Sequence, residues 1–340
     1  MQSAQEPAHI IQYEQIQIRD ADHLTATCKR LTLERTSQKT WGEAALIRCQ
    51  GLVPEGLNHI STNRSDCRGD ASQQSIVRVG SSGEAGDGCD ILCLQSPNSS
   101  DGRVDDIPPL PLENLDHDAS PESVFEDACQ TLNGSDHRQA FWHCCSSQSP
   151  ILMSDPAVIE KVDPIHATHG GVGEIMTTDS AFLHAEVAPW HLGRVDILVS
   201  GTSCIYIVIA QGSTKAFEVA IDEAFPREHR QPCSQWLGHR RVVPTLPFLR
   251  SRGIRYSVIR QNIGDAVVIF PGIYCFGVYI GKAYAQTSNF VRWRWEPFEA
   301  PYSPCIRCNR SASIKDVRSA KASGKRDVFS MMVSKTNVLI

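Results

Sequence analysis

His184 and Glu186 are the residues whose types and spacing most directly suggest chemistry. A single residue separates them in the stretch SAFLHAEVAPW. On a β-strand, residues i and i+2 point to the same face, so this imidazole and carboxylate could share one metal ion. With a His from a later strand they would complete the two-His, one-carboxylate set of non-haem Fe(II). A strand face that simply meets solvent is the alternative, and it stays open.

Cys233 and His239 form a second constellation, together with Cys305 and Cys308. The stretch CSQWLGH suits a helix or turn that presents a thiolate and an imidazole together, and CIRC spaces two further thiols by two residues. Three Cys and one His make the closed tetrahedral ligand set of structural zinc. Zinc there would tie the C-terminal end of the domain to a helical segment. The alternative is two unrelated pairs, with Cys233 in the core.

The segments that must position these residues are predicted to be short strands. Runs rich in β-branched residues and bounded by Gly or Pro indicate strands at GRVDILVSG, CIYIVIA, IRYSVIRQ, DAVVIFPG, VYIG and QTSNFVRWRW. Helices are predicted at KAFEVAIDEAF, which stops at Pro226, and at TLPFLRSRG, with Thr245 near the N-cap and Gly253 as the stop. This pattern predicts a mainly β domain over residues 151–312, built as an antiparallel double-sheet jelly roll with a helical insert.

Charge is distributed unevenly along the 340 residues. Residues 1–150 contain 11 Lys and Arg against 22 Asp and Glu, whereas residues 151–340 contain 22 against 16. Residues 1–150 are rich in Ser, Asp and Gly without sustained periodicity, so we predict an acidic, mostly disordered region. An acidic interaction region is the alternative. Residues 313–340 are predicted to be a basic disordered tail, suited to nuclear import or nucleic-acid contact, or simply solvated.

The number of cysteines, 13, indicates the cellular compartment of the protein. Their number is odd, and no secretory signal follows Met1, which indicates an intracellular protein with free or metal-bound thiols. The longest apolar run, residues 195–210, contains Asp196 and Gly201 and is too short and too polar to cross a bilayer. We therefore expect no membrane partner.

A series of motifs between residues 165 and 312 resembles the JmjC domain. The motifs occur in the family's order, as FLHAE, LVSG, CSQWLGH, RRVVPTLPFLRSRGI, IGDAVVIFPGIYCFG, AQTSNFVRW and CIRC. The likeness is to JmjC histone lysine demethylases that carry a zinc knuckle after the barrel. It implies a double-stranded β-helix, or cupin-like barrel, with a C-terminal zinc knuckle at Cys233, His239, Cys305 and Cys308. The family's last pair is usually Cys-x-Cys, whereas this sequence has Cys-x2-Cys.

The resemblance also implies where Fe(II) and 2-oxoglutarate would bind. His184 and Glu186 match two iron ligands, and Cys275 stands at the position of the family's distal His. A thiol is a poor ligand for Fe(II), and a thiolate is soft and easily oxidised. The Lys that pairs with the far carboxylate of 2-oxoglutarate in the family falls near Ser203 or Cys204, and neither of these residues is cationic.

Three further residues are candidates for binding 2-oxoglutarate by the same resemblance. Asp196 aligns near an Asn of the family and would repel the anionic co-substrate. Lys282 either replaces the missing cation or is a solvated strand-end residue. Asn289 matches the family's Asn and either serves the pocket or hydrogen-bonds the barrel.

Two functions remain open from the sequence. One is a nuclear, chromatin-associated protein that resembles histone demethylases, binds a histone tail or chromatin proteins, and has little or no activity because Cys275 replaces the His. The other is an active Fe(II)/2-oxoglutarate-dependent dioxygenase, a histone demethylase or hydroxylase with an atypical His/Glu/Cys site.

Overall fold

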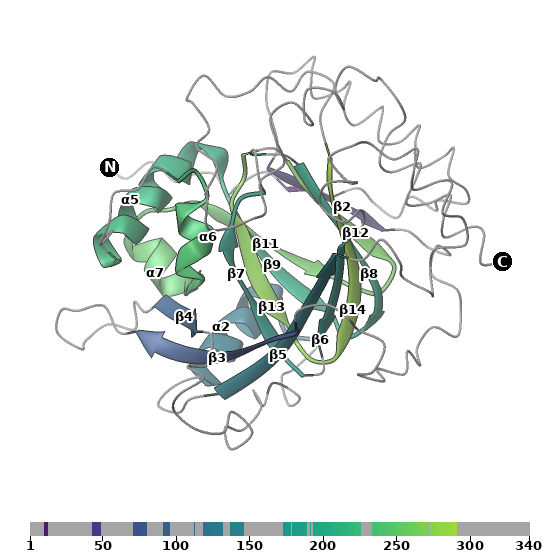
Figure 1. Cartoon of the computed structure of the whole chain (residues 1–340). Coiled ribbons are helices and arrows are strands. Elements are labelled where there is room, and N and C mark those ends of the chain that lie inside the picture. Colours follow the sequence, from purple (N-terminus) through teal and green to yellow (C-terminus); the bar gives the residue numbers. More distant parts are fainter. Residues whose placement is uncertain are drawn as a thin grey trace, which may run out of the picture.

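Two β-sheets dominate the computed structural model of the chain (Figure 1). The structure describes residues 10–12, 43–48, 71–79, 91–95, 112, 118–131, 137–145, 173–177, 179–188, 191, 193–225, 233–270 and 272–290. Its strands are β1 (Ile10–Gln12), β2 (Ala44–Arg48), β3 (Ala71–Val79), β4 (Ile91–Gln95), β5 (His137–Cys145), β6 (Gly173–Thr177), β7 (Ala181–Glu186), β8 (Gly193–Gly201), β9 (Cys204–Ile209), β10 (Val242–Pro244), β11 (Tyr256–Gln261), β12 (Asp265–Ile269), β13 (Cys275–Tyr279) and β14 (Ala283–Phe290). Its helices are α2 (Pro121–Thr131), the 3₁₀ turn η4 (Gln211–Ser213), α5 (Thr214–Ala224), α6 (Trp236–Arg240) and α7 (Leu246–Ser251).

The larger sheet has the strand order β1-β2-β12-β8-β14-β6-β5-β3-β4-β10, and the smaller sheet has the order β11-β9-β13-β7. Every pairing between these strands is antiparallel except that of β1 with β2. The described residues therefore form a mainly β structure with antiparallel sheets, as the sequence predicts. The chain alternates between the sheets, so that β8 lies in the larger one and its neighbours β7 and β9 lie in the smaller one.

Strand β9 is buried on both faces, because it separates two hydrophobic clusters. Its side chains alternate with a period of two residues. Cys204, Tyr206 and Val208 join a cluster with residues of the larger sheet such as Leu198 and Val267. The side chains at 205, 207 and 209 join the other cluster, with the helices. The interior between the two sheets is thus packed with side chains from both.

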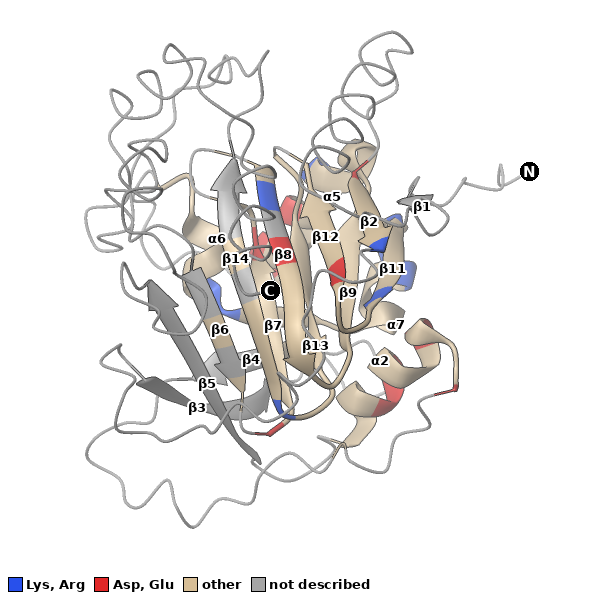
Figure 2. Ribbon diagram, turned by 90° about the vertical axis from the view of Figure 1, so that its right-hand side faces the viewer, with Lys and Arg blue, Asp and Glu red and all other residues tan. Residues whose placement is uncertain are grey.

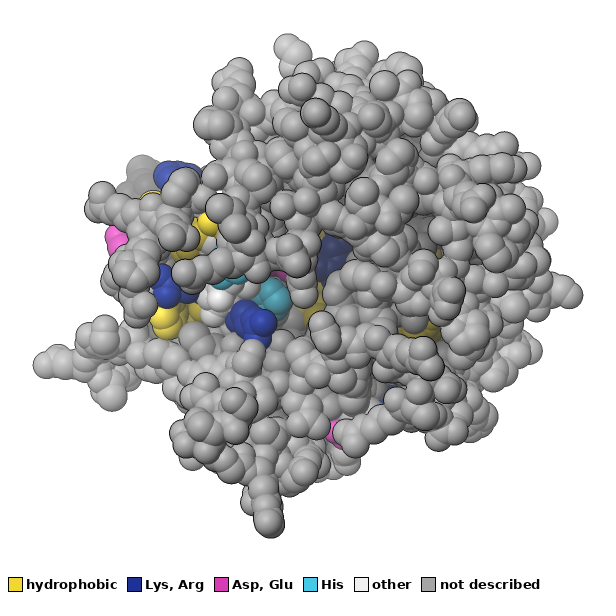
Figure 3. Space-filling model, in the orientation of Figure 1, with side chains coloured by type: hydrophobic (Ala, Val, Ile, Leu, Met, Phe, Trp, Pro, Cys, Tyr) yellow, Lys and Arg dark blue, Asp and Glu magenta, His cyan; other side chains and the backbone are white. Residues whose placement is uncertain are grey.

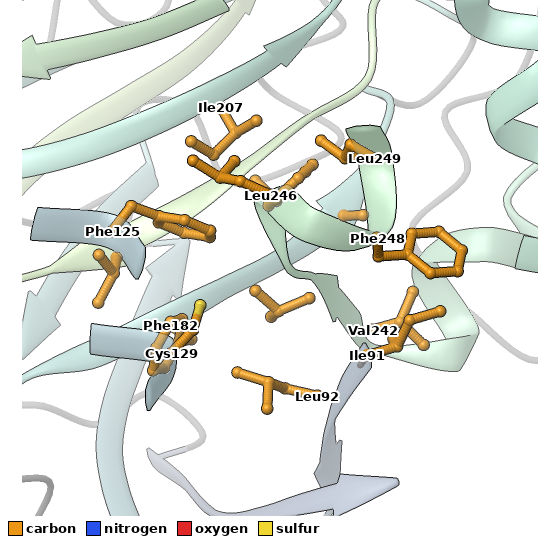
Figure 4. Packing of buried hydrophobic residues seen from close by; sticks show 14 of the residues in the cluster. Ile91, Leu92, Phe125, Cys129, Phe182, Ile207, Val242, Leu246, Phe248 and Leu249 are labelled. Atoms are coloured by element: carbon orange, nitrogen blue, oxygen red, sulfur yellow. The ribbon is translucent and has the colours of Figure 1, made fainter. Parts of the chain in front are cut away.

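The helices cover the outer face of the smaller sheet (Figure 1). Figure 4 shows the cluster beneath them, which contains Leu246, Phe248 and Leu249 of α7 and in which Leu246 lies close to Ile207. Phe125 of α2 meets Phe182 of β7 edge-on, with 6.2 Å between the ring centroids. Burying aromatic rings of this size contributes much of the stabilisation of such a cluster.

Two helices occupy the segments in which the sequence predicts them. Helix α7 begins after Thr245, whose side-chain oxygen accepts a hydrogen bond from the Phe248 N–H at 3.3 Å. It ends before Gly253, whose φ of 63° suits a residue without a Cβ. Helix α5 ends at Ala224, one residue before Phe225 and two before Pro226. Among the described residues, no helix is long and apolar enough to cross a membrane.

Parts of residues 1–150 belong to the folded unit. Strand β2 pairs along its length with β12, and Ala44 and Leu46 are buried in the cluster between the sheets. Phe125 of α2 is buried in the helix-side cluster. These segments are ordered by partners that lie far away in the sequence, and the prediction that residues 1–150 are mostly disordered stays a prediction. Residues 313–340 lie outside the described part of the chain, so the predicted tail stays a prediction.

Candidate functional site

His184 and Glu186 lie on one face of β7, with Nε2 of His184 3.5 Å from Oε2 of Glu186. The intervening Ala185 is fully buried on the other face, which is the alternation expected of a strand. Both polar side chains are partly exposed. The structure therefore brings together the first candidate pair, and their role as iron ligands stays a prediction.

Cys275 begins β13 and stands directly opposite Glu186 in the pairing of β13 with β7. Residues opposite each other on antiparallel strands share a face, so the thiol lies on the same side of the smaller sheet as the carboxylate. The Cys275 side chain is buried, at 4% exposure. Burial raises the pKa of this thiol to about 12, against the opposing influence of Arg194 and with the help of Glu186 and Asp196. Near neutral pH the group is therefore an uncharged thiol.

Arg194 is the residue of the site that the sequence reasoning missed. Its NH1 group donates to Oε1 of Glu186 at 2.6 Å, and its Nε–H donates to Oδ1 of Asp196 at 2.9 Å. Burial alone would lower the pKa of Arg194, but the carboxylates of Asp196 and Glu186 outweigh it and raise that pKa well above the ordinary value. In Figure 2 the blue and red segments on β8 show charges alternating along this strand.

A signal for Arg194 was present in the sequence. The strand GRVDILVSG is otherwise largely apolar, yet it carries a cation and an anion two residues apart. Opposite charges at i and i+2 of a half-buried strand share a face and are expected to pair. Identifying the third member, Glu186, needed the arrangement of the two sheets.

Asp196 is fully buried and continues the network into the interior. The hydroxyl of Tyr206 donates to Oδ2 of Asp196 at 3.1 Å, and the amide of Gln261 donates to the backbone carbonyl of Asp196 at 2.8 Å. Arg194 and Asp196 come from the larger sheet, whereas Glu186, Tyr206 and Gln261 come from the smaller one. The carboxylate of Asp196 is thus paired with a cation and a hydroxyl, and the polar network joins the two sheets.

The other candidates for binding 2-oxoglutarate are spread over the structure. Lys282 is exposed in the turn between β13 and β14, and its carbonyl accepts a hydrogen bond from the Thr202 N–H at 2.8 Å. That turn lies at the end of β13 away from Cys275. Asn289 of β14 stands opposite Arg194 in the pairing with β8. Ser203 precedes β9, and Cys204 is fully buried at its start.

Cys233 and His239 lie near β7, the strand that carries Glu186. Sγ of Cys233 is 3.4 Å from Nε2 of His239 and accepts a hydrogen bond from the Gln235 N–H at 3.3 Å. Helix α6, which carries His239, packs against β7, and a Cβ at Gly238 would lie 3.9 Å from Cβ of Glu186. Cys305 and Cys308 lie outside the described residues. The four-ligand zinc site therefore stays a prediction. Two of its predicted ligands, Cys233 and His239, lie next to each other in the structure.

Figure 3 shows the face of the molecule seen in Figure 1, with side chains coloured by type. Near its centre, His side chains lie next to a Lys or Arg, with an acidic side chain behind them.

The family described as JmjC domain, hydroxylase, matches residues 153–290. The match covers β6 to β14 with helices α5 to α7, and it includes the motifs whose resemblance the sequence carries up to Phe290. This segment is therefore similar to a JmjC domain, a 2-oxoglutarate oxygenase-like family whose members typically bind Fe(II) and 2-oxoglutarate. The antiparallel, mainly β architecture is consistent with the cupin-like fold of that family.

The residues present do not fit that pair of cofactors. In the described part of the chain, no three His, Cys, Asp or Glu side chains are arranged to hold a metal ion. Glu186 is bound by a guanidinium, and Cys275, which the resemblance puts at the position of a third ligand, is a neutral thiol. The interior between the sheets is packed with Tyr206 and Tyr279, both fully buried. We therefore derive no iron chemistry for this chain.

Proposed function

We propose that this protein is a nuclear, chromatin-associated protein whose JmjC-type double-stranded β-helix binds a histone tail or a chromatin protein and has little or no demethylase activity. The similarity of residues 153–290 to the JmjC domain supports the family part of this proposal. The choice of a histone tail rests on the resemblance to zinc-knuckle JmjC demethylases that the motifs carry.

The observation that carries the claim of low activity is Cys275. Its side chain is buried opposite Glu186, where an imidazole would have to complete the two-His, one-carboxylate set. Because the pKa of this thiol is raised to about 12, it offers no thiolate to a metal near neutral pH. A thiol is a weak ligand for Fe(II), and imidazole suits this ion much better. Loss of one of three ligands weakens metal binding strongly, since even changes outside the ligand shell cost about 10- to 100-fold.

A second candidate function is an active Fe(II)/2-oxoglutarate-dependent oxygenase with a His/Glu/Cys or His/Glu/water site. One observation favours it, namely that His184 and Glu186 lie on one face with 3.5 Å between their nearest polar atoms. In this alternative the metal would use Oε2 of Glu186, the oxygen nearer to His184, because Oε1 accepts the hydrogen bond from Arg194 at 2.6 Å.

Anaerobic titration of the purified full chain with Fe(II), followed by measurement of succinate after addition of 2-oxoglutarate and O₂, separates the two functions. We expect no stoichiometric tight binding at this site and no succinate above the His184→Ala variant. Tight binding of one iron together with His184-dependent succinate would establish the oxygenase instead.

Binding to peptides tests the partner class separately. Histone-tail peptides, unmodified and methylated on lysine, are titrated into the same full chain, with a scrambled peptide of equal charge as the control. We expect saturable binding of the tail peptide that exceeds binding of the scrambled one. Equal binding of the two would contradict the histone-tail part of the proposal and leave the result on iron unaffected.

A further inference from the structure

We propose that the guanidinium of Arg194 takes the place of a metal ion in this fold, as a built-in cation that holds Glu186 and joins the two sheets. On this account Arg194 closes the site to metal by itself, in addition to the loss of a ligand at Cys275. The inference goes beyond the proposed function, because it concerns how the site is closed and does not depend on any chromatin partner.

The first support is geometric. Arg194 uses two different N–H groups for two carboxylates, at 2.6 Å to Glu186 and at 2.9 Å to Asp196. Glu186 belongs to the smaller sheet, whereas Arg194 and Asp196 belong to the larger one. A planar guanidinium with fixed donors is well suited to hold two carboxylates in set positions. The candidate metal ligands on β7 and β13 all lie in the smaller sheet, so the link to the larger sheet is made by the arginine itself.

The second support is burial. The Arg194 side chain is 13% exposed and the Asp196 side chain is fully buried, so the pair is shielded from water. Charges in such a place are retained only where they are paired and hydrogen-bonded. The Tyr206 hydroxyl supplies a further hydrogen bond to Asp196 at 3.1 Å. The buried carboxylate of Asp196 is thus compensated by the arginine without any added ion.

The third support is charge. A guanidinium remains protonated at every pH at which the protein is folded. A divalent cation between His184 and Glu186 would therefore stand within a few ångströms of a fixed positive charge, at a carboxylate whose other oxygen already accepts a hydrogen bond from Arg194. Like charges at that separation repel strongly when they are shielded from water. Restoring an imidazole at position 275 leaves this obstacle in place.

The experiment compares metal binding by two variants of the full chain, Cys275→His alone and Cys275→His combined with Arg194→Gln. Co(II) is the probe, because it is stable in air and its visible spectrum reports its ligands. The protein is first given one equivalent of zinc, which the predicted thiol site takes up in preference to a site of imidazole and carboxylate, so that cobalt reports the site under test. Adding His184→Ala to each variant gives the matched control.

We expect the double variant to bind one Co(II) at least tenfold more tightly than Cys275→His alone, with the gain lost when His184 is replaced. Adding Arg194→Lys to Cys275→His keeps the charge, so this variant should bind as weakly as the single one. Equal cobalt binding by the double variant and Cys275→His, including no binding by either, would overturn the proposal. If the double variant does not fold, Asp196→Asn is added to remove the unpaired buried carboxylate, and the same comparison decides.

Discussion

The guanidinium of Arg194 donates a hydrogen bond to the carboxylate of Glu186 at 2.6 Å, from the larger sheet to the smaller one. The two residues are only eight positions apart, yet the chain crosses between the sheets within that interval. Their contact joins the strand that carries His184 to the strand that carries Asp196.

Arg194→Gln should destabilise the protein by about 3–5 kcal/mol, because removing one partner of a buried ion pair leaves the remaining charges without compensation. Thermal and urea unfolding of the full chain measure this change. Arg252→Gln is the matched control, since Arg252 pairs with Glu223 at 2.8 Å but both side chains are about half exposed. Such a surface pair is worth about 0–1 kcal/mol. Equal losses in the two variants would contradict a special role for Arg194.

Cys275 should resist alkylation in the folded protein. Its pKa is raised to about 12 by burial, from an ordinary value of 9.0, so the reactive thiolate is depleted about a thousandfold at pH 8. The labelling rate should rise with pH, since the thiolate forms only as the pH approaches 12. Iodoacetamide labelling followed by peptide mass spectrometry measures the rate, with urea-unfolded protein as the reference. Rapid native labelling of Cys275 at pH 8 would show that the thiol is neither buried nor neutral.

Gly277→Ala should destabilise the fold by about 1–3 kcal/mol, the usual range for inserting a methyl group where no space exists. A Cβ at this position would collide with the backbone carbonyl of Ile205 on β9, where β13 carries an irregular register next to Cys275. Gly238→Ala is the control, because its Cβ would meet only the Glu186 side chain at 3.9 Å, an ordinary contact. Urea unfolding measures both. Equal stability of the two variants would mean that β13 and β9 do not approach so closely.

Cys305→Ser should remove about one equivalent of zinc from the purified protein and lower its stability, because structural zinc contributes directly to folding. Metal analysis by mass spectrometry measures the content. The Cys233 and His239 side chains, with 3.4 Å between Sγ and Nε2, would provide two adjacent ligands for such an ion. The Cys204→Ser variant controls for the loss of any thiol, since Cys204 is buried inside the sheets. Full zinc content in Cys305→Ser would show that the ligands are assigned wrongly.

Local sequence patterns were enough to predict much of the domain. Neighbouring residues determine that β9 is a strand, since it is a β-branched run bounded by turns. They also determine the period of two that places His184 beside Glu186. Helix α7 likewise follows from its own Thr cap and Gly stop. These features depend on backbone geometry and local hydrogen bonds, which can be predicted from residue types that are close in sequence.

The remaining features depend on contacts between distant segments. Strand β2 is a short apolar piece in a polar region, and only its pairing with β12, more than 200 residues later, makes it a buried strand. The approach of Arg194 to Glu186 requires the two sheets to face each other in one specific way. Side-chain periodicity indicates which face a residue takes, but it does not identify the partner across the interior.

Closure of the site by Arg194 is tested most directly by 2-oxoglutarate decarboxylation by Cys275→His alone, measured as succinate released in the presence of Fe(II) and O₂. This substitution supplies the missing imidazole and leaves Arg194 bound to Glu186. The account predicts no succinate above that released by the same variant with His184→Ala added. Succinate production that depends on His184 would show that the arginine does not close the site, and it would contradict the account.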